Sequence, residues 1–302
     1  MSLPKSVQIV EVGARDGLQN QSTLVPTEVK VALIERLCDA GITHIEVGAF
    51  VSPKWVPLMA DSDKVIAKLT PRKDVIYSAL APNMKGMESA LQSGIDEVAV
   101  FIAASESFSQ KNTNCSIQEA IERAKPVIEA AKKNNIQVRA YISCVMSCPY
   151  EGDTIDPEYV ASLCKQLIDL GCKEVSLGDT NGRGTPQKTE ALVNACTQYV
   201  DVDKLAVHFH NTYGQALANL WAALNLGVST IDSSVAGLGG CPYAKGATGN
   251  VATEDVLFML DGLGIETGVD MEKLVDTAIF ISESIQVPMA SNTAQAIANT
   301  RN

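Results

Sequence analysis

Short apolar, β-branched segments alternate regularly with longer segments of helical periodicity along the 302-residue chain. The short segments have the length of strands, and the longer ones carry apolar residues at the three- and four-residue spacing of one helix face. The pattern predicts eight strands, over residues 7–14, 44–50, 75–81, 97–103, 137–143, 174–179, 205–211 and 230–235. It predicts helices between or after them, over residues 27–40, 84–93, 116–134, 157–170, 186–199, 214–226 and 252–264.

Glycine marks the end of several of these helices. Gly41, Gly94, Gly171 and Gly227 each stand just before the next predicted strand. Glycine accepts the left-handed conformation that ends many helices, and helix, glycine, short turn and strand in repetition are typical of βα units. We therefore predict an α/β fold, a closed (β/α)₈ TIM barrel. An open doubly wound sheet is the alternative, which the missing G-x-G-x-x-G after the first strand disfavours.

The predicted barrel accounts for most of the chain. We expect it to run from about residue 7 to about residue 264, followed by a C-terminal helical extension over about 265–302 that includes a helix at 270–286. Neither a low-complexity linker nor a shift in composition divides the sequence. The whole chain, 1–302, is therefore expected to form a single catalytic domain.

Composition narrows the classes of function. Hydrophobic residues make up 46% and charged residues 20%, as in globular proteins with a large core. The 35 acidic against 24 basic residues leave a net charge of −11, which argues against a nucleic-acid partner. The sequence has no apolar run long enough for a membrane helix and no signal peptide, so we expect a cytoplasmic protein. In that compartment the eight cysteines are expected to be free thiols.

The chemically active residues gather where predicted strands end. In a TIM barrel the active site lies at the C-terminal ends of the strands. The polar residues at those positions are Glu11, Arg15, Asp16, Glu46, Asp179, Asn181, His208, His210 and Asn211.

Two of the three histidines stand in the sequence VHFHN, residues 207–211. Residues i and i+2 of a strand share a face, so His208 and His210 point inward if the apolar Val207 and Phe209 face the helices. Their interpretation is open between a metal site and a hydrogen-bonded structural pair. His44, at the opposite end of the predicted barrel, is expected to be structural.

A metal at this place would need oxygen ligands as well. Asp16 is the nearest candidate, at the end of the first predicted strand. Two imidazoles with oxygen donors suit Mg²⁺ or Mn²⁺, although the ligand types also allow Zn²⁺. Cys144 and Cys148 have no Cys-x-x-Cys partner pair, which disfavours a structural zinc there.

The segment GLGGCPYAKGATGN, residues 237–250, carries five glycines and one cysteine. Glycines at this density allow the positive φ angles and hinge motion of an active-site lid. Cys241 is accordingly a candidate for proton transfer or nucleophilic attack. The alternative is a buried thiol in a turn that binds phosphate, but the segment lacks the G-K-[ST] of a P-loop.

Taken together, these segments resemble the 3-hydroxy-3-methylglutaryl-CoA lyase family, within the superfamily of metal-dependent lyases and Claisen-type synthases. R-D-G-x-Q and H-x-H-N are shared across that superfamily, whereas G-G-C-P-Y-A-x-G-A-x-G-N is specific to the lyases. The matching segments, in chain order, are VEVGARDGLQNQ (10–21), FVSPKWVPLMAD (50–61), SCPYEG (147–152), LGDTNGRGTP (177–186), VHFHNTYGQALAN (207–219) and GLGGCPYAKGATGNVATED (237–255).

The resemblance implies a divalent-metal-dependent cleavage of 3-hydroxy-3-methylglutaryl-CoA to acetyl-CoA and acetoacetate by a homodimer. The ligands of the metal, Mg²⁺ or Mn²⁺, would be Asp16, His208, His210 and Asn250. Residues that bind the acyl-CoA substrate would be Arg15, Gln19, Glu46 and Asp179. Arg15 would also stabilise an enolate, Asp16 or His208 would accept the hydroxyl proton, and Cys241 would transfer a proton.

The sequence departs from the family pattern at a few positions and leaves two other enzyme classes open. Gly48 and Ala49 stand where some members carry hydroxyl side chains, and Ser22 stands where some carry lysine. One alternative is a condensing synthase, which would usually carry an additional C-terminal domain. Another is an aldolase for a CoA-free hydroxy acid, and a non-catalytic barrel is the third. The presence of Arg15, Asp16 and both histidines disfavours the last.

Overall fold

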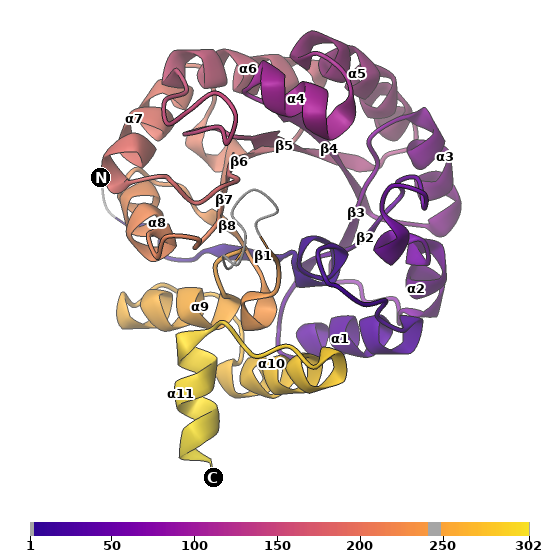
Figure 1. Cartoon of the computed structure of the whole chain (residues 1–302), viewed down its shortest axis with the longest axis vertical. Helices are drawn as coiled ribbons and strands as arrows, with labels where there is room; N and C mark the ends of the chain where they lie inside the picture. The colour runs from indigo at the N-terminus through magenta and orange to yellow at the C-terminus, as the bar shows by residue number, and fades with distance from the viewer. Residues whose placement is uncertain (1–2, 241–248, 302) are drawn as a thin grey trace.

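The computed structural model describes residues 3–240 and 249–301. Its eight strands form one closed barrel in which each strand pairs in parallel with the next along the chain, and the last pairs with the first. Figure 1 looks down this ring of strands, with helices around the outside. The strands are β1 (Gln8–Glu11), β2 (His44–Ala49), β3 (Ile76–Leu80), β4 (Glu97–Ala103), β5 (Gln137–Ser143), β6 (Glu174–Asp179), β7 (Leu205–Phe209) and β8 (Thr230–Ser233).

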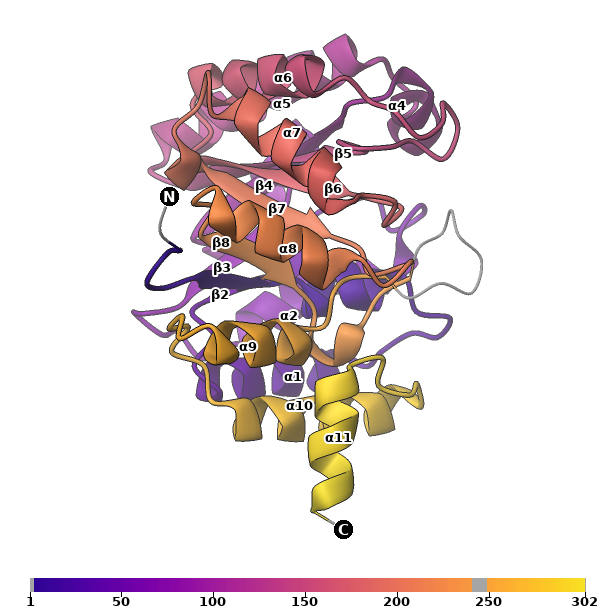
Figure 2. The ribbon, with the colours of Figure 1, turned by 90° about the vertical axis from the view of Figure 1, so that its left-hand side faces the viewer.

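The outer layer contains the predicted helices and three further ones. Six helices alternate with the strands as expected, and α9 follows the last strand. They are α1 (Thr27–Asp39), α3 (Met84–Ser93), α5 (Ile117–Lys133), α6 (Pro157–Leu170), α7 (Pro186–Cys196), α8 (Ala216–Asn225) and α9 (Thr253–Gly262). Beyond the barrel, α10 (Met271–Ile285) matches the expected helix at 270–286, and α11 (Asn292–Thr300) projects from the side of the molecule (Figure 2).

The helix boundaries follow local capping chemistry. The four glycines expected before strands all have positive φ, between 74° and 114°. At the N-terminal ends, the side chains of Asn83, Ser116 and Thr185 accept hydrogen bonds from backbone N–H groups of the first turn. The prediction of a TIM barrel is therefore confirmed, and so are the glycine caps on which that prediction was based.

The first strand is shorter than predicted, and two short helices were not predicted at all. β1 ends at Glu11, and the chain then forms one turn of π-helix, Gly13–Gly17, in place of the expected strand residues. The glycines permit this turn, since a Cβ on Gly13 would lie 2.6 Å from Oε1 of Glu11. The unpredicted helices are α2 (Ser62–Lys68) and α4 (Glu106–Thr113).

In the described part of the chain, no helix combines the length and the hydropathy that crossing a bilayer requires.

Candidate metal centre and active site

The two histidines of VHFHN lie at the C-terminal end of β7. Val207 and Phe209 are buried, and His208 and His210 line a cavity at the mouth of the barrel. The two residues are 8% and 6% exposed, and their Nε2 atoms lie 3.3 Å apart. The two histidines therefore point in the same direction, as predicted, and one ring nitrogen of each is directed at a common point.

Asp16 joins the histidines from the π-helical turn after β1. One carboxylate oxygen of Asp16 and one ring nitrogen of each histidine all lie within 4.8 Å of one another, a separation that one metal ion can bridge. Asn250, the fourth predicted ligand, lies beside Asp16, and its Nδ2 donates to Oδ2 of Asp16 over 2.8 Å. A backbone bridge between His210 and Asn250 holds it there. These residues, distant in sequence, thus bring together two imidazoles and a carboxylate, with the side-chain amide of Asn250 beside them.

The charge states of this group suit a cation. Burial opposes ionisation of Asp16, but Arg15 and the histidines outweigh it and lower the pKa of Asp16 to about 2. Burial, with the neighbouring His208, lowers the pKa of His210 to about 4. At neutral pH, Asp16 is therefore a carboxylate and His210 is a neutral imidazole, which are the forms that bind metals. The donor set fits Mg²⁺ or Mn²⁺, because it contains no thiolate.

Arg15 is fixed beside the candidate metal centre by two ion pairs. Its Nε lies 2.5 Å from Oε2 of Glu46, and its Nη1 lies 2.6 Å from Oδ1 of Asp16. Its guanidinium also packs 5.6 Å from the centre of the Tyr141 ring. Burial would lower the pKa of Arg15, but the two carboxylates raise it above its ordinary value. Arg15 therefore remains a cation on the wall of the cavity, held in a single orientation.

The other residues predicted to bind substrate take different positions. Gln19 lines the cavity and donates from Nε2 to Oδ1 of Asp16 over 3.2 Å. Glu46 is fully buried behind Arg15. Asp179 is also buried, at the end of β6, where Oδ2 accepts from the backbone N–H of Gly184 and Oδ1 has no hydrogen-bond partner among the described residues. Burial raises the pKa of Asp179 to about 6. Cys241 lies outside the described residues.

The barrel interior contains a charged group that the sequence reasoning missed. Arg139 of β5 forms ion pairs with Glu174 of β6 and Asp232 of β8, and all three are buried. Asp232 also lies 3.2 Å from Nδ1 of His208, directly below the candidate metal centre. The available signal was a charge in the middle of a predicted buried strand, as in QVRAYIS (137–143) and TIDSSV (230–235), since unpaired charges are rarely buried.

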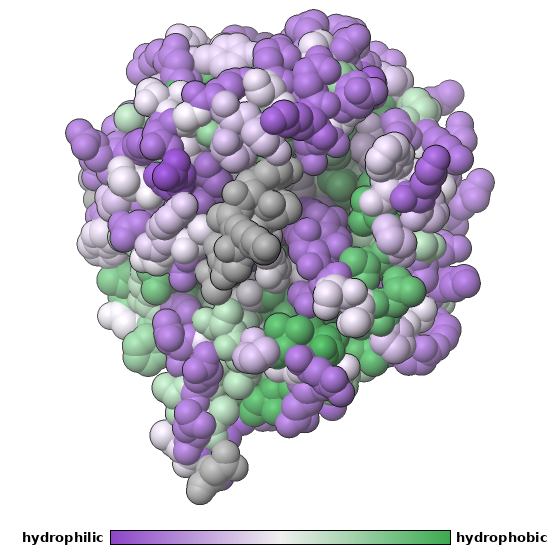
Figure 3. Space-filling view, in the orientation of Figure 1, coloured by the Kyte–Doolittle hydropathy of each residue, from purple (hydrophilic) through white to green (hydrophobic). Residues whose placement is uncertain are grey.

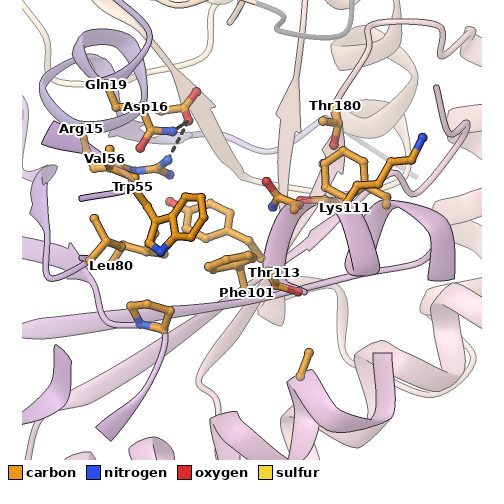
Figure 4. A pocket seen from close by; sticks show the side chains of 18 of the residues that line it. Arg15, Asp16, Gln19, Trp55, Val56, Leu80, Phe101, Lys111, Thr113 and Thr180 are labelled. Atoms are coloured by element: carbon orange, nitrogen blue, oxygen red, sulfur yellow. Dashed lines mark hydrogen bonds and ion pairs between the residues drawn. The ribbon is translucent and has the colours of Figure 1, made fainter. Parts of the chain in front are cut away.

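The cavity extends well beyond the candidate metal centre. It has a volume of about 690 Å³ and reaches across the mouth of the barrel to α4. Figure 3 shows this face hollowed near its centre, with hydrophilic and hydrophobic residues at the edge of the hollow. In Figure 4, Arg15, Asp16 and Gln19 lie on one side, and Lys111 and Thr180 lie on the other. The apolar wall of the cavity is formed by Val51, Trp55, Leu80 and Phe101. Its basic rim is formed by Lys111 and Arg123.

Known proteins are similar to this chain in sequence and in architecture. The family model described as HMGL-like matches residues 6–281. A Pseudomonas aeruginosa protein named 3-hydroxy-3-isohexenylglutaryl-CoA/hydroxy-methylglutaryl-CoA lyase is 56% identical, covering 98% of this chain and 99% of that protein. A crystal structure of hydroxymethylglutaryl-CoA lyase from Pseudomonas aeruginosa superposes with a TM-score of 0.97 at 55% identity, over 99% of this chain and 100% of the other. An HMG-CoA lyase from Acinetobacter baumannii in complex with coenzyme A and 3-methylmalate superposes with a TM-score of 0.92 at 32% identity, covering 98% and 96%.

Proposed function

The chain belongs to the HMGL-like family, and from that premise we propose that it is a hydroxymethylglutaryl-CoA lyase. It cleaves 3-hydroxy-3-methylglutaryl-CoA to acetyl-CoA and acetoacetate. The observation that carries the assignment to this site is the convergence of Asp16, His208 and His210 beside the buried cation Arg15, on the wall of one large cavity. Arg15 and Asp16 follow β1, whereas the two histidines lie at the end of β7, so the site joins two regions that are far apart in sequence.

The proposed cofactor is a divalent cation, Mg²⁺ or Mn²⁺, held by Asp16, His208, His210 and Asn250. When bound, such a cation polarises substrate oxygens and lowers the pKa of a coordinated hydroxyl group. The burial of both imidazoles and the ionised state of Asp16 support this assignment. The side-chain amide nitrogen of Asn250 donates to Asp16 and to the Leu238 carbonyl, which holds the amide group beside the carboxylate. Its carbonyl oxygen is the atom that would bind the cation.

The reaction breaks the bond between C2 and C3 of the substrate. Asp16 accepts the proton of the C3 hydroxyl, whose oxygen becomes the ketone of acetoacetate. His208, the other candidate acceptor, can take this proton only when its Nε2 does not hold the cation. The electron pair of the broken bond moves to C2 and the thioester, giving the enolate of acetyl-CoA. Arg15 stabilises the negative charge on the thioester oxygen, because its orientation is fixed by Glu46 before the reaction starts. Proton donation to C2 yields acetyl-CoA, and we assign it to the Cys241 thiol on the evidence of the sequence.

The positive charge at the edge of the cavity supports an acyl-CoA as the substrate. Its basic rim at Lys111 and Arg123 stands out on a chain with a net charge of −11, and the phosphates of coenzyme A are anionic. Gln19 and Asp179 are proposed to orient the acyl part. The homodimer and the cytoplasmic location remain predictions from the sequence, and sedimentation of the purified protein tests the first of them.

The direct test is release of acetoacetate from 3-hydroxy-3-methylglutaryl-CoA by the purified protein. We expect turnover with Mg²⁺ or Mn²⁺ and a thiol reductant, and we expect EDTA to abolish it. Lack of turnover in the presence of metal would contradict the proposal. The next substrates would then be acetyl-CoA with 2-oxo acids, as for a condensing synthase, and CoA-free hydroxy acids, as for an aldolase.

A second substrate is favoured by the apolar wall of the cavity. The Pseudomonas aeruginosa relative is named for an isohexenyl as well as a methyl compound. Val51, Trp55, Leu80 and Phe101 provide apolar surface for a longer C3 substituent in a cavity of about 690 Å³. We expect 3-hydroxy-3-isohexenylglutaryl-CoA to be cleaved, and Leu80→Phe to reduce that activity more than cleavage of the methyl substrate. Equal effects on both substrates would exclude Leu80 from this selectivity.

A further inference from the structure

Below the candidate metal centre, Asp232 is surrounded by hydrogen-bond donors. Nη2 of Arg139 donates to Oδ1 over 2.5 Å, and Nη1 donates to Oδ2 over 3.0 Å. The Ser176 hydroxyl donates to Oδ2 over 2.8 Å, and Nδ1 of His208 lies 3.2 Å from the same oxygen. A carboxylate in a bidentate pair with a buried guanidinium stays ionised and can only accept hydrogen bonds.

These contacts settle which nitrogen of His208 carries the proton. Because ionised Asp232 cannot donate, the hydrogen bond to Nδ1 requires a proton on Nδ1. The Nε2 lone pair of His208 is then free, and it points toward His210 and Asp16. An edge-on contact with the Tyr141 ring, 5.9 Å between centres, supports the same ring orientation.

His210 lacks a corresponding support. Its Nδ1 is buried and has no hydrogen-bond partner among the described residues, while its Nε2 lies 3.3 Å from Nε2 of His208. With His208 protonated on Nδ1, that contact is a hydrogen bond only if His210 carries its proton on Nε2. The two histidines therefore differ, since one is already the tautomer that a metal requires and the other must move its proton to Nδ1.

We propose that Asp232, clamped by Arg139, is the positioning residue that presets His208 as the metal-binding tautomer, so that metal affinity depends on a contact below the site. The inference rests on the proposed function, because it assigns His208 as a ligand of the divalent cation. Carboxylates that orient metal-bound histidines commonly account for 10- to 100-fold in metal affinity. Because Arg139 on β5 holds Asp232 on β8, the metal affinity depends on residues from both strands of the barrel interior.

The first measurement uses the unmodified protein without metal. Nitrogen-15 correlation spectra of the histidine rings have only three residues to distinguish, His44, His208 and His210. We expect His208 to be protonated on Nδ1 and His210 on Nε2, and saturating Mg²⁺ to change the tautomer of His210 only. A His208 ring protonated on Nε2 in the metal-free protein would overturn the proposal, and this test needs no variant to fold.

The second measurement compares Mn²⁺ affinity between variants in the absence of substrate, by electron paramagnetic resonance. Asp232→Asn is expected to raise the Kd for Mn²⁺ about 10- to 100-fold, and higher Mn²⁺ is expected to restore part of the turnover. Glu174→Gln is the matched control, because Glu174 pairs with the same guanidinium over 2.6 Å and the structure gives it no contact with His208. Its Kd should equal that of the unmodified protein.

The possible outcomes separate this inference from the proposed function. An unchanged Kd in Asp232→Asn, or an equal loss in Glu174→Gln, would overturn the role of Asp232 even if the unmodified protein cleaves its substrate. Absence of cleavage by the unmodified protein would instead contradict the proposed function, and the tautomer of His208 would still report on Asp232.

Discussion

The two ends of the barrel use the same side-chain types in opposite ways. At the N-terminal end of β2, His44 has partners on both ring nitrogens, Gln8 at 3.2 Å and Glu97 at 2.9 Å, and Lys173 lies 2.5 Å from the other oxygen of Glu97. At the C-terminal end, His208 and His210 direct their Nε2 atoms at the same point as Asp16.

The difference shows how a structural histidine can be distinguished from a ligand. A buried polar group normally has its hydrogen bonds satisfied by the protein, because an unsatisfied group costs free energy. At His44 that requirement is met on both nitrogens. At the other end, Nδ1 of His210 has no hydrogen-bond partner among the described residues, and the Nε2 atoms of His208 and His210 face one another 3.3 Å apart. A cation between these two nitrogens would make the arrangement favourable.

Substituting one histidine at each end gives the sharpest test. His210→Ala removes a proposed metal ligand, and since a bound metal contributes several kcal/mol to catalysis, turnover should fall by about 10⁴-fold or more. His44→Ala should leave turnover per folded molecule and Mn²⁺ affinity unchanged while it lowers stability. Acetoacetate release and Mn²⁺ titration of both variants measure this. Equal loss of Mn²⁺ binding in the two would remove the distinction between the ends.

Cys241→Ala separates proton transfer from metal binding within the C-terminal end. If Cys241 protonates the acetyl-CoA carbon, turnover should fall by about 10²- to 10⁴-fold, the usual contribution of a general acid. The Kd for Mn²⁺ should not change. Cys144→Ala is a useful control, because Cys144 is a buried free thiol with a pKa raised by burial. Near-normal turnover in Cys241→Ala would refute the assignment.

At the N-terminal end, the expected effect is on stability alone. Glu97→Ala removes the shared partner of His44 and Lys173, and breaking a buried ion pair costs about 3–5 kcal/mol. Chemical denaturation measures that loss. The specific activity of the folded fraction should stay the same, and a large decrease in it would mean that this cluster also shapes the distant active site.

The two ends should also respond to pH in opposite directions. Burial opposes ionisation of Glu97, but His44 and Lys173 outweigh it and lower its pKa to about 2, so stability from this group is lost as the pH falls from about 4.5 to about 2. Glu254 lies near the other end, where its Oε1 accepts from the backbone N–H of Ala236. Burial raises its pKa from 4.5 to about 8.

The sign for Glu254 follows from proton binding. Between about pH 4.5 and about pH 8 the folded state keeps a proton that the unfolded state has lost, so the free energy of unfolding falls as the pH rises through that window. Glu254→Gln should flatten this part of the curve. Denaturant unfolding across the window, with Glu97→Gln as the variant that changes only the acidic branch, measures the effect. An unchanged slope in Glu254→Gln would show that other groups dominate it.

Much of the fold could be predicted because its determinants are local. All eight strands and the seven helices that alternate with or follow them lie where apolar periodicity and glycine caps placed them. The failures have local causes too. The segment after Glu11 continues an apolar pattern but adopts a π-helical turn, because Gly13 and Gly17 allow a close packing that periodicity does not describe. The helix α4 is polar and short, so it has no clear apolar face.

The candidate site could be predicted only in part. His208 and His210 share a face because of their spacing on one strand, which is a property of the sequence. Their roles, with those of Asp16 and Asn250, remain predictions that the geometry supports. The contact between Arg139 and Asp232 could not be predicted, since 93 residues separate them and no local pattern reports which strands face each other across a barrel.

The amino-acid order was therefore enough to predict the order of strands and helices, the inward direction of the two histidines and the family to which the chain is similar. These features depend on interactions between residues close in sequence, or on segments that can be compared directly with those of known families. Three features came from the three-dimensional fold alone: Asp16 approaches the histidines, Glu46 holds Arg15, and Asp232 contacts one imidazole and not the other. Those features depend on closure of the barrel, which brings distant strands to one buried place where each charge must find a partner.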